Sequence, residues 1–395
     1  MSEKIYITGI GVNSAIGLNV EENLNSLVAE KSGIGPIHFL ESHHKNEFVA
    51  GELKLPNEQL AAKVNVEDVE HPRTGLLAIM AAQEAYKMAK LESISPTRIG
   101  IIGGTTVGGM DKTEKHYLQA ASHPEFILTH SSGYITELVA NTLNIQGYIS
   151  TLNTACSSST NAMITAVRLI KHGHADAIIA GGFDSLSKFT LNGFKTLMIL
   201  SPEACKPFDK NRQGLNLGEG AGFLVLESEK SVKARNIKPL AILAGSANTN
   251  DAYHQTASSP DGKGAYLSMQ KALQRASLNP HDIDYINVHG TGTDNNDLTE
   301  GIAIKRLFEN KVPELSSTKA YTGHTLGAAG GIEAVYSILA LQNNLAYPNL
   351  RFEDVMPEVG IVPTTSLIRN KTIKHVMSNS FGFGSNDSTV IFSKI

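Results

Sequence analysis

The 395-residue sequence contains no tryptophan, only two cysteines and no long apolar run. Cys156 and Cys205 cannot form a disulfide framework, and a membrane-spanning helix needs roughly 20 apolar residues in a row. The formal net charge of −4 provides no general basic field, which argues against nucleic acid as a partner. The first residues lack the basic and long apolar segments of a signal peptide. These absences predict a cytoplasmic globular protein without a membrane span.

Short apolar runs that end in glycine alternate along the chain with stretches of helical periodicity. This alternation is typical of βαβ units around buried sheets and predicts an α/β fold. The length suggests about two or three domain-sized units. The expected strands are Ile5–Gly9, Ile99–Gly104, Ala177–Gly182, Leu240–Gly245 and Ile283–Gly290, and the expected helices are Thr74–Lys90, Tyr266–Ser277, Leu298–Glu309, Gly331–Asn343 and the segment after Cys156.

The two halves of the sequence show a weak internal symmetry. In the first half, an extended run, Cys156 and a helix precede the apolar segment Asp176–Asp184. In the second half, the segment Ser316–His324 and a helix precede His375–Gly382. This pattern predicts one α/β unit used twice, with residues 1–230 as an N-terminal half and residues 231–395 as a C-terminal half. Because no low-complexity linker separates the halves, we expect them to pack tightly.

Cys156 follows a run rich in β-branched residues and precedes a run with helical spacing. The thiol is therefore expected at a helix N-terminus, where the helix dipole and unpaired backbone N–H groups favour a thiolate. Such a position can lower a cysteine pKa from about 8.5 to roughly 3.5–7.5. A buried, inert cysteine is the competing interpretation, but the strand-to-helix context favours a nucleophile.

Two of the 14 histidines lie in glycine-flanked motifs that suit a functional site. His289 ends an apolar run and opens a Gly-Thr-Gly-Thr turn, and His324 follows Gly323 just ahead of a helix. Together with Cys156, these imidazoles suggest acyl-thioester chemistry. The short-range ligand pairs typical of a zinc site are missing, so no metal site is predicted.

Two other interpretations were weighed against this one. A papain-like protease would use Cys156, one of the two histidines and a later asparagine such as Asn379, which occur in the required order. The residues around Cys156 do not match the papain-type motif. A dinucleotide site at Gly9–Gly17 is disfavoured because Ser14 occupies the third glycine position of the fingerprint. These glycines are instead expected to close a tight strand-to-helix turn.

Ordered motifs run nearly from end to end of the chain. They include Asn153-Thr-Ala-Cys-Ser-Ser-Ser159, Pro207–Gly214, Gly218–Gly222, Asp251-Ala-Tyr-His254, His289-Gly-Thr-Gly-Thr293, Ser317-Thr-Lys319, Gly323–Gly330 and Asn379-Ser-Phe-Gly-Phe-Gly384. These motifs resemble those of the β-ketoacyl-[acyl-carrier-protein] synthases of the thiolase superfamily, in particular the elongating Cys-His-His type near synthase II. The resemblance implies a thiolase-like five-layer α-β-α-β-α sandwich built from two similar halves. Thiolase itself uses a late second cysteine, and the initiating class has asparagine at the position of His324.

The resemblance implies a role for each reactive residue. Cys156 would carry the acyl group as a thioester, and neutral His289 and His324 would stabilise the enolate that forms when a malonyl thioester loses carbon dioxide. The backbone N–H groups of Cys156 and Phe383 would hold the second oxyanion. No metal or cofactor is implied.

The resemblance also implies supporting residues. Lys319 would tune the electrostatics of the histidines with Glu333 as its ionic partner, and scaffold charge balance is nearly as good an interpretation of this pair. Phe383 resembles the family's gate between the cysteine and the acyl pocket, and Gly382 and Gly384 would supply the hinge freedom for its movement.

The implied reaction is the decarboxylative condensation of an enzyme-bound acyl group with malonyl-acyl carrier protein to give 3-oxoacyl-acyl carrier protein, as in fatty-acid elongation. Acyl carrier protein is then the expected partner, and a homodimer the expected assembly. Two departures adjoin active-site loops: the family's Pro-Leu-Gly-Asp reads Asp294-Asn-Asn-Asp297 here, and its Gly-Thr-Asn reads Ser385-Asn386-Asp387. They keep open a specialised polyketide or aryl-polyene-type pathway, a heterodimer with a synthase-like subunit, and a non-catalytic carrier-binding subunit.

Overall fold

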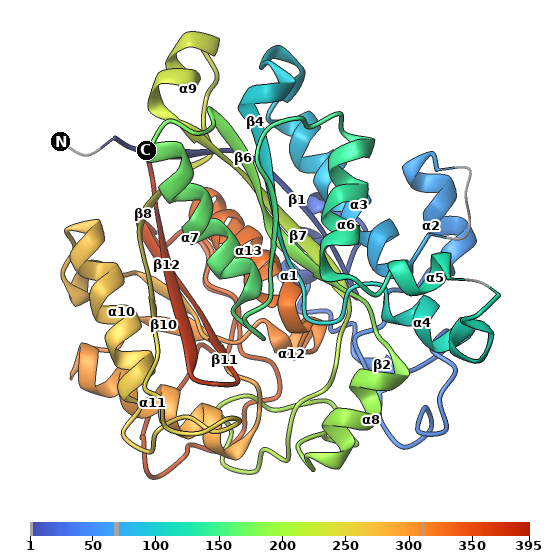
Figure 1. Ribbon diagram of the computed structural model, residues 1–395. Coiled ribbons are helices and arrows are strands. Elements are labelled where there is room, and N and C mark those ends of the chain that lie inside the picture. Colours follow the sequence, from blue (N-terminus) through green and yellow to red (C-terminus); the bar gives the residue numbers. More distant parts are fainter. Residues whose placement is uncertain (1–2, 67–70, 123, 310) are drawn as a thin grey trace.

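Two sets of five strands form the centre of the computed structural model, which describes residues 3–66, 71–122, 124–309 and 311–395 (Figure 1). Most of these strands are buried along almost their whole length, as expected for strands covered on both faces. The first set comprises β1 (Ile5–Ser14), β4 (Ile99–Gly104), β5 (Ile149–Leu152), β6 (Ala177–Asp184) and β7 (Gly220–Ser228), and the second comprises β8 (Ala241–Thr249), β9 (Tyr285–Asn287), β10 (Glu314–Ser316), β11 (His375–Gly382) and β12 (Asn386–Ser393).

Both sets have the same topology. The order β1-β7-β6-β4-β5 in the first corresponds to β8-β12-β11-β9-β10 in the second, with antiparallel pairing among the first three strands and parallel pairing among the last three. The sets meet where β1 pairs with β8 at only two positions, Tyr6 with Ile242 and Ile7 with Ala241. The expected two similar halves are therefore joined edge to edge in one ten-stranded sheet, and the boundary at residues 230 and 231 stays a prediction.

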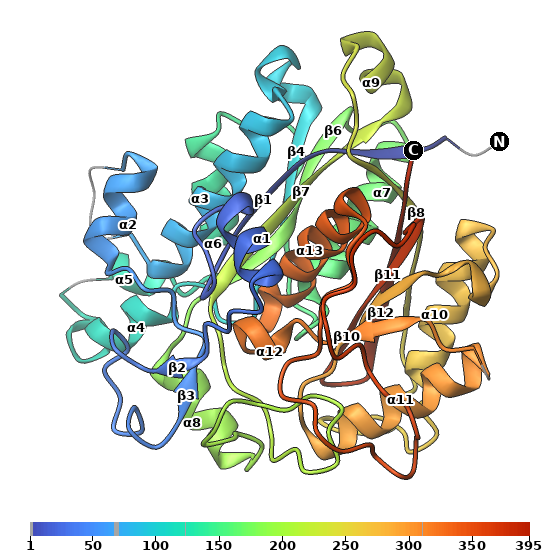
Figure 2. The same cartoon turned by 180° about the vertical axis from the view of Figure 1, so that it is seen from behind.

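Helices cover the strands in three layers, which Figures 1 and 2 show from opposite sides. The layer formed by α7 (Ser158–Lys171) and α13 (Ala329–Asn343) contacts strands of both sets. On the outer faces, α3 (Arg73–Met88) and α6 (Ser132–Thr142) cover the first set, and α10 (Lys263–Ala276) covers the second. Helix α11 (Asp294–Phe308) packs against α10 and shares a hydrophobic cluster with the second set. Because α13 is central, it is buried on all sides from Ala329 to Leu341. This arrangement confirms the predicted layered α/β fold.

The remaining elements border this framework. They are α1 (Val20–Val28), α2 (Asn57–Val64), α4 (Met110–His116), α5 (Glu125–Leu128), α8 (Lys188–Thr196), α9 (Glu229–Arg235), α12 (Lys319–Thr322) and the small hairpin of β2 (Gly35–Pro36) and β3 (Val49–Ala50). Over the described ranges, none of the helices has the length and apolar character needed to cross a bilayer.

Gly17 closes the predicted turn between β1 and α1, because its backbone exchanges hydrogen bonds of 2.8 and 3.2 Å with Ser14. The prediction was wrong for Gly9 and Gly11. Strand β1 continues through Gly9 and Gly11 as far as Ser14. A Cβ atom at Gly9 would lie 2.3 Å from the carbonyl oxygen of Ala85, and one at Gly11 would lie 2.0 Å from that of Ala81. The glycines are therefore needed because the backbone of α3 lies directly against the strand.

We expect the substitution Gly11→Ala to lower the free energy of unfolding by about 1–3 kcal/mol, because the added methyl group must displace backbone atoms of α3. Urea unfolding followed by circular dichroism measures this change. Gly193→Ala is the matched control: nothing lies within 4 Å of its Cβ position in α8, so it should leave stability unchanged or raise it by up to about 1 kcal/mol. Equal effects of the two substitutions would contradict the packing argument.

Candidate active site

Cys156 lies in the tight connection between β5 and α7, just before the helix begins. The preceding residue, Ala155, has a φ angle of +53°, a conformation that residues other than glycine rarely adopt. The strained turn directs the thiol toward the second half of the molecule, and Cys156 is only 6% exposed. The predicted strand-to-helix setting of this cysteine is therefore present.

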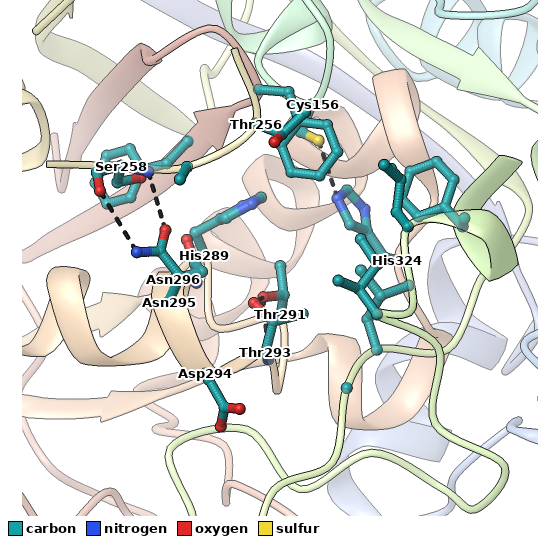
Figure 3. A pocket seen from close by; sticks show the side chains of 18 of the residues that line it. Cys156, Thr256, Ser258, His289, Thr291, Thr293, Asp294, Asn295, Asn296 and His324 are labelled. Carbon is teal, nitrogen blue, oxygen red and sulfur yellow. Dashed lines mark hydrogen bonds between the residues drawn. The ribbon is translucent and has the colours of Figure 1, made fainter. Parts of the chain in front are cut away.

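His324 contacts the cysteine directly. Its Nε2 atom lies 3.1 Å from Sγ of Cys156 (Figure 3). The backbone N–H of Leu326 donates a hydrogen bond of 3.1 Å to Nδ1 of His324. Because Nδ1 accepts, a neutral His324 ring carries its proton on Nε2, where the N–H faces the sulfur and the cavity beside it.

His289 follows β9 and faces the same cavity. The ammonium group of Lys319 contacts Nδ1 of this ring at 3.2 Å and donates a hydrogen bond of 2.6 Å to the His289 carbonyl oxygen. Since an ammonium group can only donate, Nδ1 of His289 accepts and the proton of the neutral ring is again on Nε2. The two imidazole rings meet edge to face with 5.4 Å between their centres.

Both histidines are neutral in this site. Burial lowers the pKa of each ring well below its ordinary value, and the positive charge of Lys319 lowers it further. The cavity therefore receives two N–H donors and no imidazolium charge.

Lys319 and Glu333 form the ion pair that the resemblance implies. Lys319 is 2% exposed in the short helix α12, and its ammonium group donates a short hydrogen bond to Oε1 of Glu333 in α13. Burial raises the pKa of Glu333 to about 7, although the positive charge of Lys319 opposes this shift. The pair thus links the helix that precedes His324 to the central layer.

The pKa of the Cys156 thiol differs from the one predicted from the sequence. Burial raises its pKa to about 11, and this effect outweighs the positive charge of Lys319 and hydrogen bonds from the backbone N–H groups of Phe383 and Cys156. The predicted lowering of the pKa was therefore wrong for the unliganded site, because the sulfur is screened from water. The two N–H groups beside the sulfur are nevertheless in place to bind a negatively charged atom.

A cavity of about 290 Å³ opens onto these three side chains (Figure 3). Phe383 lines it, is 36% exposed and stacks on Phe194 of α8 with 6.1 Å between ring centres. The lining of the cavity includes an apolar wall and a polar wall. The apolar wall includes Phe194, Leu197, Met198 and Ile199, and the polar wall includes Thr256, Ser258, Thr291, Thr293, Asp294, Asn295 and Asn296.

Comparison with known proteins identifies this arrangement. The model of the β-ketoacyl synthase N-terminal domain matches residues 2–231, and that of the C-terminal domain matches residues 240–353. The chain belongs to the β-ketoacyl synthase family. It is 34% identical to 3-oxoacyl-[acyl-carrier-protein] synthase 2 of Staphylococcus aureus, over 100% of this chain and 99% of that protein. The family, the fold and the acyltransferase class predicted from the sequence are thereby confirmed.

Two solved structures extend the comparison. The ishigamide ketosynthase/chain length factor matches this synthase with a TM-score of 0.92 and 28% identity, and the match covers 100% of both chains. The structure of a type II PKS acyl-carrier protein in complex with its ketosynthase bound to the hexaketide matches with a TM-score of 0.90 and 26% identity, also over 100% of both chains. The synthase is thus similar to a ketosynthase of a type II PKS and to the ishigamide ketosynthase/chain length factor as well as to a synthase 2.

The two glycines beside Phe383 have different surroundings in the synthase. A Cβ atom at Gly382 would lie 3.0 Å from the carbonyl oxygen of Thr154 and 3.2 Å from the backbone nitrogen of Cys156, so little space remains there. Gly384 has a φ angle of +79° and nothing within 4 Å of its Cβ position. Gly382 therefore permits close packing against the cysteine turn, whereas Gly384 permits an unusual backbone conformation.

Asn379 does not orient either histidine, as the protease interpretation would require. Its side chain donates a hydrogen bond of 3.1 Å to Glu300 and accepts one of 3.0 Å from Thr389. Cys205 is buried away from the cavity lining, and its thiol contacts the carbonyl oxygen of Lys319.

Cys156, His289 and His324 have ligand atoms within 4.8 Å of one another, a spacing that a metal ion could bridge. The ammonium group of Lys319 beside His289 disfavours a second cation at this position.

Sequence reasoning missed two acids that brace the His289 loop. Glu300 accepts the N–H groups of His289 and Gly290 at 2.9 and 2.8 Å, and Asp297 accepts that of Thr291 at 2.9 Å. Both acids lie in the first turns of α11, directly after the loop. Acidic residues just after a glycine-rich turn were the available signal, because carboxylates at a helix start bind free N–H groups.

Replacing Lys319 with methionine should lower the free energy of unfolding by about 3–5 kcal/mol, because the carboxyl group of Glu333 loses its buried partner. Chemical denaturation measures the loss. Lys371→Met is the control, since Lys371 pairs with Glu314 where both side chains are partly exposed and should lose less than about 1 kcal/mol. A Lys319→Met protein as stable as this control would refute the structural importance of the pair.

Proposed function

We propose that this synthase condenses an enzyme-bound acyl group with a malonyl group carried by acyl carrier protein, with loss of carbon dioxide, in fatty-acid elongation. The observation that carries the proposal is the meeting of the Cys156 thiol with the Nε2 atoms of neutral His289 and His324 at one cavity. Full-length similarity to a 3-oxoacyl-[acyl-carrier-protein] synthase supports it.

In the first half-reaction, the sulfur of Cys156 attacks the carbonyl carbon of an acyl thioester. A new carbon–sulfur bond forms, the bond to the carrier sulfur breaks, and the thiol proton ends on the departing carrier thiol. The backbone N–H groups of Cys156 and Phe383 hold the negative oxygen of the tetrahedral intermediate, because both already point at the sulfur. This step converts Cys156 into an acyl thioester and so leaves no buried thiolate behind.

In the second half-reaction, a malonyl thioester enters and its carbon–carbon bond to the carboxylate breaks. Carbon dioxide leaves, and the electron pair of that bond forms an enolate whose oxygen accepts hydrogen bonds from Nε2–H of His289 and of His324. Neutral rings suit this role because each keeps its proton while donating it. The enolate carbon attacks the acyl group and the bond to Sγ breaks. The thiolate of Cys156 then takes a proton from water as the 3-oxoacyl product, longer by two carbons, departs. Lys319 fixes the proton-bearing nitrogen of His289 throughout.

Mixing the synthase with acyl- and malonyl-acyl carrier protein and recording intact masses tests this scheme. We expect an acyl adduct on Cys156 and a carrier product longer by two carbons, and neither species with Cys156→Ala. His289→Ala and His324→Ala should still acquire the adduct but condense about 10²–10³-fold more slowly, because each loses one oxyanion donor.

Cys205→Ala is the matched control, since this cysteine does not line the cavity, and it should retain both activities. A lengthened product from Cys156→Ala, or peptide cleavage without condensation, would sink the proposal. Binding of the carrier without any adduct would indicate a non-catalytic carrier-binding subunit.

The biosynthetic pathway in which the synthase acts is a separate question from the reaction. The departures Asp294, Asn295 and Asn296 line the cavity, and the similar solved structures include ketosynthases of polyketide systems. Both observations favour a specialised polyketide or aryl-polyene-type pathway as the alternative to fatty-acid elongation. A panel of acyl carriers that differ in length, unsaturation and aromaticity distinguishes the two, and we place either activity in the cytoplasm.

The assembly proposed for this synthase is a dimer through β5. This strand ends the sheet, and Tyr148 and Ile149 at its start are 42% and 39% exposed. An open apolar edge of this kind pairs readily with another strand. We propose a second copy of this chain as the occupant, with a synthase-like subunit such as the chain length factor of the ishigamide protein as the alternative.

Ile149→Lys should raise the dimer dissociation constant roughly tenfold or more, because the paired edge would bury an unpartnered charge. Sedimentation velocity over a concentration series measures the constant. Val362→Lys serves as the control, since Val362 is 62% exposed and lies outside β5. A purified chain that stays monomeric and dimerises only with another subunit would favour the heterodimer.

A further inference from the structure

Asp387 is a buried acid near the start of β12, shortly after Phe383 in the chain. Its side chain is 2% exposed, and among the described residues its Oδ1 atom has no hydrogen-bond partner. It stands where the family resemblance places an asparagine. An unpaired carboxyl group therefore occupies a position where a neutral amide is expected.

The negative charges of two further acids affect the pKa of Asp387. A Cβ atom at Gly264 of α10 would lie 2.0 Å from Oδ2 of Asp387 and 3.4 Å from Oδ2 of Asp251, so both carboxyl groups face the same glycine. Glu300 of α11 is the other charged group whose field acts on Asp387. The element packed against β12 at this point, α10, places the backbone of Gly264 beside the carboxyl group. Among the described residues, the charges that act on the pKa of Asp387 are those of Asp251 and Glu300, and both are negative.

The two aspartates differ in protonation state at neutral pH. Burial, with the negative charges of Asp251 and Glu300, raises the pKa of Asp387 to about 8. Burial also raises the pKa of Asp251, but hydrogen bonds, among them those from the backbone N–H groups of Ser259 and Tyr253, outweigh it and hold that pKa below its ordinary value. Asp251 is therefore ionised while Asp387 is neutral.

The two aspartates lie at the base of two segments that line the cavity. The backbone N–H of Gly384 donates a hydrogen bond of 2.7 Å to the carbonyl oxygen of Gln255, and the side chain of Asn250 donates one of 2.6 Å to the carbonyl oxygen of Gly384. Segment 250–259 presents Thr256 and Ser258 to the cavity, and segment 382–387 presents Phe383, whose N–H points at the Cys156 sulfur.

We propose that Asp387, buried without a hydrogen-bond partner for Oδ1 and close to Asp251, is a positioning residue that keeps segments 250–259 and 382–387 together and so holds the Phe383 N–H beside Cys156. The neutral carboxyl group tolerates the charged Asp251 at close range. Loss of the proton puts a second negative charge at this buried place, the two segments move apart, and the oxyanion donor leaves the sulfur. This role rests on the proposed condensation activity.

Single-turnover condensation by the full-length synthase, measured between pH 6.5 and 9.5, tests the role. The wild-type rate should fall about tenfold from pH 7 to pH 9, as a group with a pKa near 8 gives up its proton. Asp387→Asn keeps a neutral side chain at every pH, so its rate should change by no more than about twofold over the same range. Asp284→Asn, an acid remote from the cavity lining, should keep the wild-type profile. A fall with Asp387→Asn equal to that of the wild type would overturn the proposal.

Infrared difference spectroscopy of wild type against Asp387→Asn separates this proposal from the proposed function. A protonated-carboxyl band should be present in the wild type at pH 7, lost by pH 9 and missing from the variant. Absence of the band at pH 7, or a wild-type rate that stays level while the band disappears, refutes the role of Asp387. If the synthase condenses no acyl donor at any pH, the condensation proposal fails, and the band still reports the proton on Asp387.

Discussion

The burial of one positive charge, the ammonium group of Lys319, is the constraint on which the rest of the site depends. A buried ammonium must use its hydrogens, and here they go to Glu333 and to the carbonyl oxygen and Nδ1 of His289. These contacts determine which nitrogen of His289 carries its proton, and the charge adds to the effect of burial, which keeps both imidazoles neutral. One side chain thereby sets the donor direction of His289 and contributes to the electrostatics of both rings.

The repeated topology explains how distant segments reach one point. Cys156 precedes α7 and His324 precedes α13, and these two helices form the shared central layer. The chain segments just before the two helices bring these side chains together, so that Sγ of Cys156 lies 3.1 Å from Nε2 of His324. Helix N-termini attract negative charge and disfavour a charged imidazole, so the meeting point suits an oxyanion. Each half of the chain contributes one side of the reaction centre.

The centre and the cavity rim differ in how they are built. Residues at the centre are held by several hydrogen bonds each, as with the His289 loop on Glu300 and Asp297. The rim carries residues from the two stretches in which this chain departs from its family: Asp294, Asn295, Asn296 and Ser385 line the cavity. One fold can therefore combine a reaction centre that is common to the family with a cavity rim that is particular to this chain.

The sequence alone determined the α/β class, the internal repeat and the settings of Cys156, His289 and His324, because each can be read from neighbouring residues. The pairing of Lys319 with Glu333 was implied only by the resemblance to the family. The catalytic roles of these residues stay predictions. Tertiary structure decided what depends on surroundings: Gly9 and Gly11 serve close packing of α3 and not a turn, and burial raises the pKa of Cys156 where the helix start predicted a lower one. Glu300 and the carboxyl pair of Asp251 and Asp387 also emerged only in three dimensions. Desolvation and backbone contact arise between segments far apart in the chain, and no local pattern of residues records them.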